Sequence, residues 1–172
     1  MVLRRVLIGM TILLAMAGGI LPASAEPAAS RPAGAQAAWI RISNDNSGKC
    51  LAVPRGDAYP GAVVVQWTCN GGASQSWYTN GTAWSSLRYD SVHCLAIGGG
   101  SKANGAKAIL WPCNGGAEQL WSVDMASHLL ISSPIYNSNS DKALAIGNAS
   151  KAEGAAVIQW EPNGRLEQDW WF

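Results

Sequence analysis

Apolar residues in this chain come in short bursts in which apolar and polar positions alternate, starting at Trp39. Cys50–Val53 and Val63–Trp67 are two of these bursts. Clusters of turn-forming residues separate them, at 44–48, 54–57 and 70–72. No stretch after Leu21 keeps its apolar residues at a helical period. The pattern therefore predicts an all-β fold made of short strands joined by turns.

This pattern of strands and turns occurs three times, in units of about 39–80, 81–125 and 126–172. Each unit ends in Gln-x-Trp, and the closing tryptophans Trp77, Trp121 and Trp170 are 44 and 49 residues apart. One unit is too small to bury its own apolar face, so the three must share a core. About four strands per unit, or about twelve in all, can close into a barrel without exposed edges. We therefore predict a β-trefoil with pseudo-threefold symmetry.

The two repeated residues of Gln-x-Trp are expected to have different roles. The tryptophan of each unit is predicted to lie in the shared core, where it can bury about 150–250 Å². The glutamine two residues earlier is expected to hydrogen-bond the backbone of the preceding turn. The three glutamines are Gln75, Gln119 and Gln168.

The four cysteines also follow the repeat. Cys50 and Cys69 flank the central loop of the first unit, and Cys94 and Cys113 flank that of the second at the same spacing. In the third unit both aligned positions are replaced, by Ala143 and Pro162. Loss of both partners together favours the pairs Cys50–Cys69 and Cys94–Cys113 over a zinc site, and no Cys-x-x-Cys spacing supports zinc.

The first 25 residues are predicted to be a secretory signal peptide. Arg4 and Arg5 precede an apolar run from Val6 to Leu21, and Ala23-Ser-Ala25 supplies the small residues of a cleavage site. The run is short for a membrane-spanning helix, although a retained N-terminal anchor is the alternative. Residues 26–38 are rich in Pro, Ala and Gly and are expected to form a flexible leader. We therefore expect a secreted protein that is not attached to a membrane after cleavage.

Composition narrows the classes of partner. The chain has 12 Lys and Arg against 11 Asp and Glu, and only 13% of its residues are charged. Such a near-neutral surface without a basic stripe argues against nucleic acid and anionic membranes as partners. Nine tryptophans stand beside one phenylalanine, and the repeats account for most of this excess.

The recurring Cys-Leu-x-Val, Trp-x-Cys-Asn and Gln-x-Trp motifs resemble the ricin B-chain-type lectin domain, a β-trefoil of three Gln-x-Trp repeats. The resemblance extends from about Ile40 to Phe172. It implies a secreted sugar-binding module without catalytic activity. Pockets of this family use an aromatic residue just before the second cysteine. That position holds Trp67, Trp111 and Trp160.

The resemblance is incomplete at two other pocket positions. The family has an Asp two residues after the first cysteine, where this chain has Ala52, Ala96 and Ala145. It has an Asn immediately before the Gln of Gln-x-Trp, where this chain has Ser74, Glu118 and Glu167. Further candidate contacts are the turn residues Asn70, Asn114 and Asn163, together with Gln75, Gln119 and Gln168.

Several hypotheses therefore stay open at the level of sequence. Glu118 and Glu167 either accept sugar hydroxyls from the opposite side of the pocket or are solvated loop carboxylates. The three tryptophans before the second cysteine position either stack on sugar rings or pack beneath the loops. The favoured function is a carbohydrate-binding module that takes a glycan or polysaccharide. The alternative is a trefoil that has lost sugar binding and acts through protein contacts, as an inhibitor or a cell-envelope adaptor.

Residues suited to catalysis are few, and the sequence predicts neither an enzyme nor a bound cofactor or metal. His93 and His128 lie outside the repeated motif. Asp45-Asn-Ser-Gly48 has only part of a calcium-binding loop and is more typical of a turn.

Overall fold

The computed structural model describes residues 38–80, 84–122 and 131–172, all of which belong to one compact unit. The predicted signal peptide, nearly all of the predicted leader, and His128 lie outside these residues. Strand β1 begins at Ala38, one residue before the predicted start of the domain. Within the described ranges, no helix has both the length and the apolar character needed to cross a lipid bilayer.

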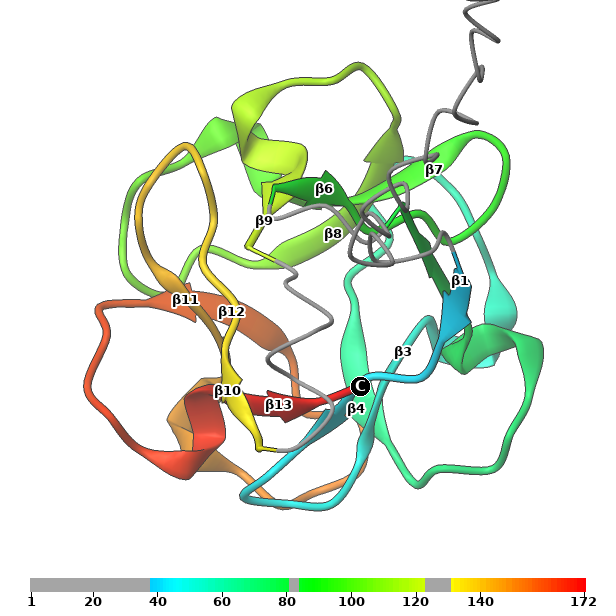
Figure 1. Cartoon of the computed structure of the whole chain (residues 1–172). Helices are drawn as coiled ribbons and strands as arrows, with labels where there is room; N and C mark the ends of the chain where they lie inside the picture. Colours follow the sequence, from blue (N-terminus) through cyan, green and yellow to red (C-terminus); the bar gives the residue numbers. More distant parts are fainter. Residues whose placement is uncertain (1–37, 81–83, 123–130) are drawn as a thin grey trace, which may run out of the picture. The chain divides into compact units, whose positions relative to one another are not determined.

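Short strands and single turns of 3-10 helix make up each repeat (Figure 1). The strands of the first repeat are β1 (Ala38–Ile40), β2 (Ser43–Asn44), β3 (Cys50–Ala52), β4 (Val65–Trp67) and β5 (Trp77–Thr79). Those of the second are β6 (Ser85–Ser86), β7 (His93–Ile97), β8 (Ala108–Pro112) and β9 (Leu120–Trp121). Those of the third are β10 (Ser133–Pro134), β11 (Ala143–Ile146), β12 (Val157–Trp160) and β13 (Asp169–Trp171).

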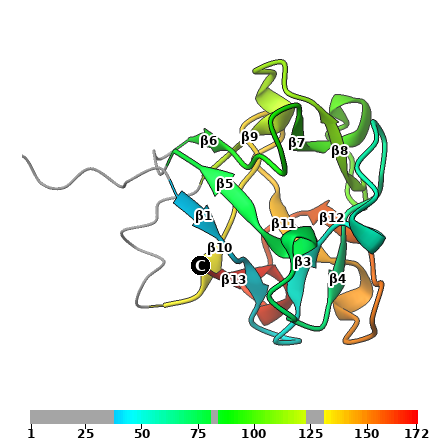
Figure 2. The same ribbon diagram turned by 90° about the vertical axis from the view of Figure 1, so that its right-hand side faces the viewer.

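The repeats are arranged around a common pseudo-threefold axis, so the predicted β-trefoil is confirmed (Figure 1). The inner strands of each repeat form an antiparallel hairpin: β3–β4, β7–β8 and β11–β12. The outer strands join one another and the neighbouring repeats, as where β13 of the third repeat pairs with β2 of the first. Figure 2 shows the outer strands toward one end and the hairpins toward the other.

The core is built by all three repeats, and the Gln-x-Trp tryptophans are its largest fully buried side chains. Trp77, Trp121 and Trp170 are fully buried. Each indole Nε1 donates a hydrogen bond to a backbone oxygen 26 residues earlier, at 2.9–3.0 Å; the acceptors are Leu51, Leu95 and Leu144. A buried Trp N–H needs such a partner, so the same contact orients the ring in every repeat.

A disulfide holds the closing turn of the first two repeats, and the Gln-x-Trp glutamine holds this turn in all three. The Cys50–Cys69 and Cys94–Cys113 disulfides are present, which confirms the predicted pairing. In the first repeat the Gln75 amide accepts from the Asn70 backbone N–H at 2.9 Å and donates to the Thr68 carbonyl at 2.8 Å. Gln119 and Gln168 make the same two bonds in their own repeats. The glutamine therefore supplies, from a side chain, the hydrogen bonds that this turn lacks in its own backbone.

Buried polar side chains connect one repeat to the next. Gln66 of the first repeat donates to the carbonyls of Ser150 and Ala152 in the third, at 2.8 and 2.9 Å. Gln159 of the third repeat donates in the same way to Ser101 and Ala103 of the second. These bonds fix the neighbouring hairpin loops beside the strands that carry Trp67 and Trp160.

Candidate functional site

Each repeat has a shallow hollow beside its hairpin, and a tryptophan forms one wall of it. The hairpin register is the same in all three repeats: Trp67, Trp111 and Trp160 lie opposite the first cysteine position, which holds Cys50, Cys94 and Ala143. These tryptophans are 46%, 44% and 43% exposed, so they do not pack beneath the loops. Three similar rings are therefore accessible to a ligand.

The three hollows have volumes of about 330, 200 and 270 Å³ in the first, second and third repeats. Their floors are alike, because Ala52, Ala96 and Ala145 are buried beneath them. The residue that the ricin-type family would use as an acid is thus a buried methyl group in every repeat. A polar ligand must find its hydrogen-bond partners on the other walls.

A 3-10 turn after each hairpin's first strand forms the opposite wall. It contains Arg55 in the first repeat, Gly99 in the second and Asn148 in the third. All three residues have positive φ, between 54° and 62°. None of the residues predicted for the site belongs to this wall, although the aligned segments after Cys-Leu-Ala-Val and its equivalents mark it in every repeat.

The predicted turn residues are only partly available to a ligand. Asn70 and Asn163 line the first and third hollows, whereas Asn114 does not line the second. The side-chain oxygen of all three accepts a backbone N–H two residues later, at 2.8–2.9 Å. Gln75, Gln119 and Gln168 are buried and hydrogen-bonded to the turn, and only Gln75 and Gln168 reach a hollow. These six residues primarily shape the turn.

The hollows differ most in charge. The second contains one carboxylate, Glu118, which lies so close over the turn that a Cβ added at Gly116 would collide with it. The third contains Glu167, whose carboxylate accepts from the Asn163 amide at 3.0 Å, together with Arg165. The first has Ser74 at the equivalent position and no acid among its lining residues.

Other groups considered at the level of sequence lie outside these hollows. His93 Nδ1 is 2.9 Å from Asp90 Oδ2. The Asp45 carboxylate accepts from Trp171 Nε1 at 3.0 Å and from Ser132 Oγ at 2.8 Å, so this segment serves as a contact between repeats. Across the described ranges, no three His, Cys, Asp or Glu side chains cluster as metal ligands would.

Comparison with known proteins shows which family the chain belongs to. A family model described as the ricin-type beta-trefoil lectin domain matches residues 38–170. No curated protein sequence matches the chain.

Solved structures with the same fold include designed and natural proteins. ThreeFoil, a designed threefold-symmetric protein, is 30% identical with a TM-score of 0.70, over 77% of this chain and 96% of its own. 1,3Gal43A, an exo-beta-1,3-galactanase from Clostridium thermocellum, has the same identity, TM-score and coverage of this chain, but the match spans only 29% of the enzyme. The C-half of an earthworm R-type lectin, solved with GalNAc, is 19% identical with a TM-score of 0.58, over 77% of this chain and 95% of its own.

Proposed function

Because the chain belongs to the ricin-type β-trefoil lectin family, we propose that it is an exported carbohydrate-binding module without catalytic activity. It binds glycan in up to three shallow hollows, each with a tryptophan platform. The observation that carries this proposal is the repetition of one half-exposed tryptophan, in one register, beside every hollow.

Stacking is the main attraction that these hollows offer. The C–H face of a pyranose is apolar and matches the face of an indole ring, and its hydroxyls then point toward the remaining walls. Two of the platforms each lie next to a glycine of a neighbouring repeat. A Cβ built on Gly154 would lie 3.6 Å from the Trp67 ring, and one on Gly105 would lie 3.7 Å from the Trp160 ring. The backbone of another repeat therefore lies beside each of these two rings.

Glu118 and Glu167 take over the recognition of hydroxyls in the second and third hollows. Loss of the family's Asp removes a charge-assisted hydrogen bond of about 1.5–3 kcal/mol. A carboxylate on the opposite wall restores an acceptor of the same strength, with the sugar in a different orientation. The first hollow has only Ser74 there and is expected to bind most weakly.

Weak single sites are consistent with a polymeric ligand. Three hollows on one rigid domain can engage one polysaccharide together, and a second contact then becomes intramolecular. We therefore propose a polysaccharide, recognised mainly by stacking, as the natural ligand. A neutral glycan is the class that the second hollow accommodates, since Glu118 is the one charged residue in its lining and repels an anionic sugar.

A second candidate is a trefoil that works through protein contacts. The observation that favours it is the buried alanine at all three Asp positions. On this alternative the exposed tryptophans would contact a protein surface, where Trp is common among the residues that dominate binding energy.

A glycan array followed by calorimetry with variants separates the two candidates. Trp67→Ala, Trp111→Ala and Trp160→Ala each remove one platform, and the triple variant is expected to lose at least tenfold in affinity for a responding glycan. Trp39→Ala is the matched control, because Trp39 is 61% exposed and lines none of the three hollows. If no glycan binds at millimolar concentration, the lectin proposal fails.

Export is the part of the proposal that rests on residues 1–25 and the two disulfides. Disulfides form in oxidising compartments, which supports an extracellular destination. The mass of the protein recovered from culture medium tests it. Cleavage after Ala25 gives a chain that begins at Glu26, and retention of residues 1–25 would contradict export by a cleaved signal.

A further inference from the structure

A fourth hollow of about 250 Å³ lies away from the three tryptophan platforms, on the outer face of the strands where the first and second repeats meet. Side chains alternate between the two faces of an extended segment. Ser85 and Leu87 are buried, so Trp84, Ser86 and Arg88 share the outer face.

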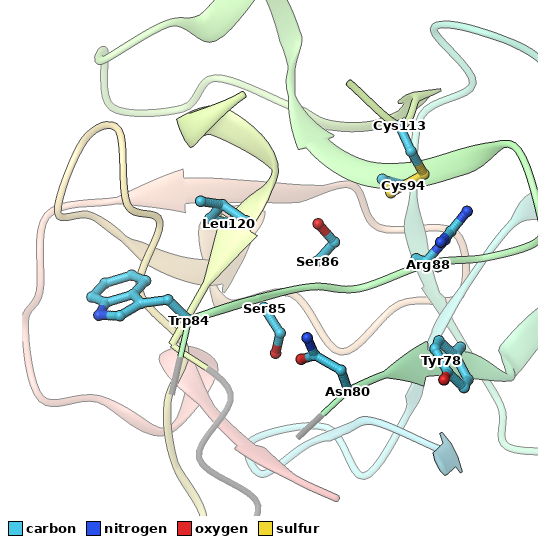
Figure 3. Close-up of a pocket in the computed structure, with 9 residues that line it drawn as sticks. All are labelled: Tyr78, Asn80, Trp84, Ser85, Ser86, Arg88, Cys94, Cys113 and Leu120. Atoms are coloured by element: carbon cyan, nitrogen blue, oxygen red, sulfur yellow. A yellow bond between two sulfur atoms is a disulfide. The ribbon is translucent and has the colours of Figure 1, made fainter. Parts of the chain in front are cut away.

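Neighbouring strands extend this face on both sides. Ser86 is paired with Leu120 of β9, and Arg88 with Tyr78 of β5. Figure 3 shows Trp84 and Leu120 at one end of the hollow, Arg88 beside the Cys94–Cys113 disulfide at the other, and Ser86 between them. The hollow therefore has an apolar aromatic end, a polar middle and a cationic end.

The cation of this hollow has no acidic partner among the described residues. Arg88 Nη2 donates to the Ser91 carbonyl at 2.8 Å. None of the ion pairs within the described ranges includes Arg88. The nearby Asp90 carboxylate instead binds the His93 side chain and the backbone N–H groups of Val92 and His93. A guanidinium has five N–H donors, so Arg88 retains donors for an anion.

We propose that this hollow binds an acidic oligosaccharide, with Trp84 stacking on one sugar ring and Arg88 pairing with the carboxylate of a uronic acid further along. Arg matches carboxylates with two parallel hydrogen bonds, which distinguishes them from neutral hydroxymethyl groups. Ser86 lies between them and offers a hydroxyl to the sugar.

The spacing of the two anchors sets the size of the ligand. Trp84 and Arg88 are four residues apart on an extended segment, which separates their Cα atoms by roughly 13 Å. One pyranose ring cannot reach both. The hollow therefore selects an oligosaccharide and discriminates against a free uronic acid.

Titration calorimetry with tetragalacturonate tests this proposal. Arg88→Gln is expected to weaken binding at least tenfold, because it removes a charge-assisted hydrogen bond. Trp84→Ala is expected to weaken it about three- to tenfold through the loss of stacking. Arg41→Gln is the matched control, since it removes the same charge from the segment between β1 and β2 of the first repeat, and Arg41 does not line the hollow.

Matched ligands sharpen the test. The methyl ester of tetragalacturonate has the same sugar rings without the charges. The affinity of the wild type for this ester is expected to be no higher than the affinity of Arg88→Gln for tetragalacturonate. Equal affinity of wild type and Arg88→Gln for tetragalacturonate would overturn the proposal, as would equal affinity of the wild type for the ester. Near-UV circular dichroism checks that both variants are folded, and Arg88→Lys provides a milder second substitution.

The proposal for this hollow and the proposal for the tryptophan platforms can be tested independently of each other. Trp111→Ala is expected to leave tetragalacturonate binding unchanged, and Arg88→Gln to leave neutral glycan binding unchanged. Binding of tetragalacturonate that is lost with Trp111→Ala would place the acidic ligand at the platform and sink the proposal for the fourth hollow.

Discussion

The first two repeats are closed by disulfides and the third is not, yet the three have the same local structure. Cys50–Cys69 and Cys94–Cys113 each join residues 19 apart, with Cα atoms separated by 5.1 Å. The third repeat has Ala143 and Pro162 at these positions. Its Trp170 still donates to the Leu144 carbonyl at 2.9 Å, and Gln168 still bridges its turn.

This comparison teaches that side-chain contacts with the backbone determine the conformation of a repeat, whereas the disulfide adds stability. In the third repeat an ion pair between Lys142 and Glu161 links the two residues next to the missing cysteines. An exposed ion pair is worth about 0.2–1 kcal/mol. A disulfide that closes a loop of this length contributes about 3 kcal/mol. The third repeat is therefore expected to be the least stable of the three.

The largest expected effect comes from removing a core tryptophan in the repeat without a disulfide. Trp170→Ala deletes a fully buried ring and leaves the Leu144 carbonyl without its partner. We expect a loss of about 3–5 kcal/mol in the free energy of unfolding, measured by urea denaturation. Trp121→Ala should cost as much in equilibrium stability, but its disulfide should keep residual structure in the unfolded chain and lower the m-value.

A matched exposed tryptophan controls for the loss of the ring itself. Trp39 is 61% exposed and contacts Tyr78 edge-on, with ring centroids 5.6 Å apart. Trp39→Ala is expected to cost less than about 1 kcal/mol. A similar small cost for Trp170→Ala would contradict the view that the Gln-x-Trp tryptophans determine the fold.

The next largest effect is expected when the first repeat loses its disulfide and so resembles the third. The double variant Cys50→Ala, Cys69→Ala should lose about 3 kcal/mol of stability in chemical denaturation. Hydrogen exchange should still show a protected β3–β4 hairpin, because Trp77 and Gln75 keep their backbone contacts. Loss of that protection under native conditions would mean that the disulfide, and not the side-chain contacts, determines the hairpin.

The comparison also explains which features sequence alone could predict. The β-trefoil and both disulfide pairs follow from repetition, because three aligned copies constrain one another. The buried Gln66 could not be predicted in the same way. Its partners, Ser150 and Ala152, belong to another repeat and become neighbours only when the barrel closes.

The candidate site could be predicted only in part, because the repeated motif marks some of its residues and not others. The three tryptophans Trp67, Trp111 and Trp160 could be named from the repeated motif, and the structure places each beside a hollow. The turn residues Asn70, Asn114 and Asn163 were named for the ligand, but their side-chain oxygens hold the turn itself. The hollow beside Trp84 was not predicted because its walls come from two repeats and mostly from residues outside the motifs.

The smallest expected effect concerns the hydrogen bonds of Asp45, which connect the first repeat to the third. Hydrogen bonds from Trp171 and then Ser132 hold the pKa of Asp45 below its usual value. Burial, followed by the charges of Asp45 and Glu167, raises the pKa of Asp169.

Since the folded pKa of Asp45 lies below the unfolded one, the stability it contributes is present at neutral pH and is lost as the pH falls below about 4. Asp45→Ala should therefore cost about 1 kcal/mol or less at pH 7, because the contact is exposed. The difference from wild type should shrink toward acid pH as Asp45 becomes protonated. The variant also removes a charge that raises the pKa of Asp169, which makes the difference at pH 7 smaller. Thermal unfolding from pH 3 to 7 measures this, with Asp57→Ala as a control whose partner Arg55 lies in the same repeat. A difference that stays constant over this range would show that the Asp45 charge does not help to hold the third repeat in place.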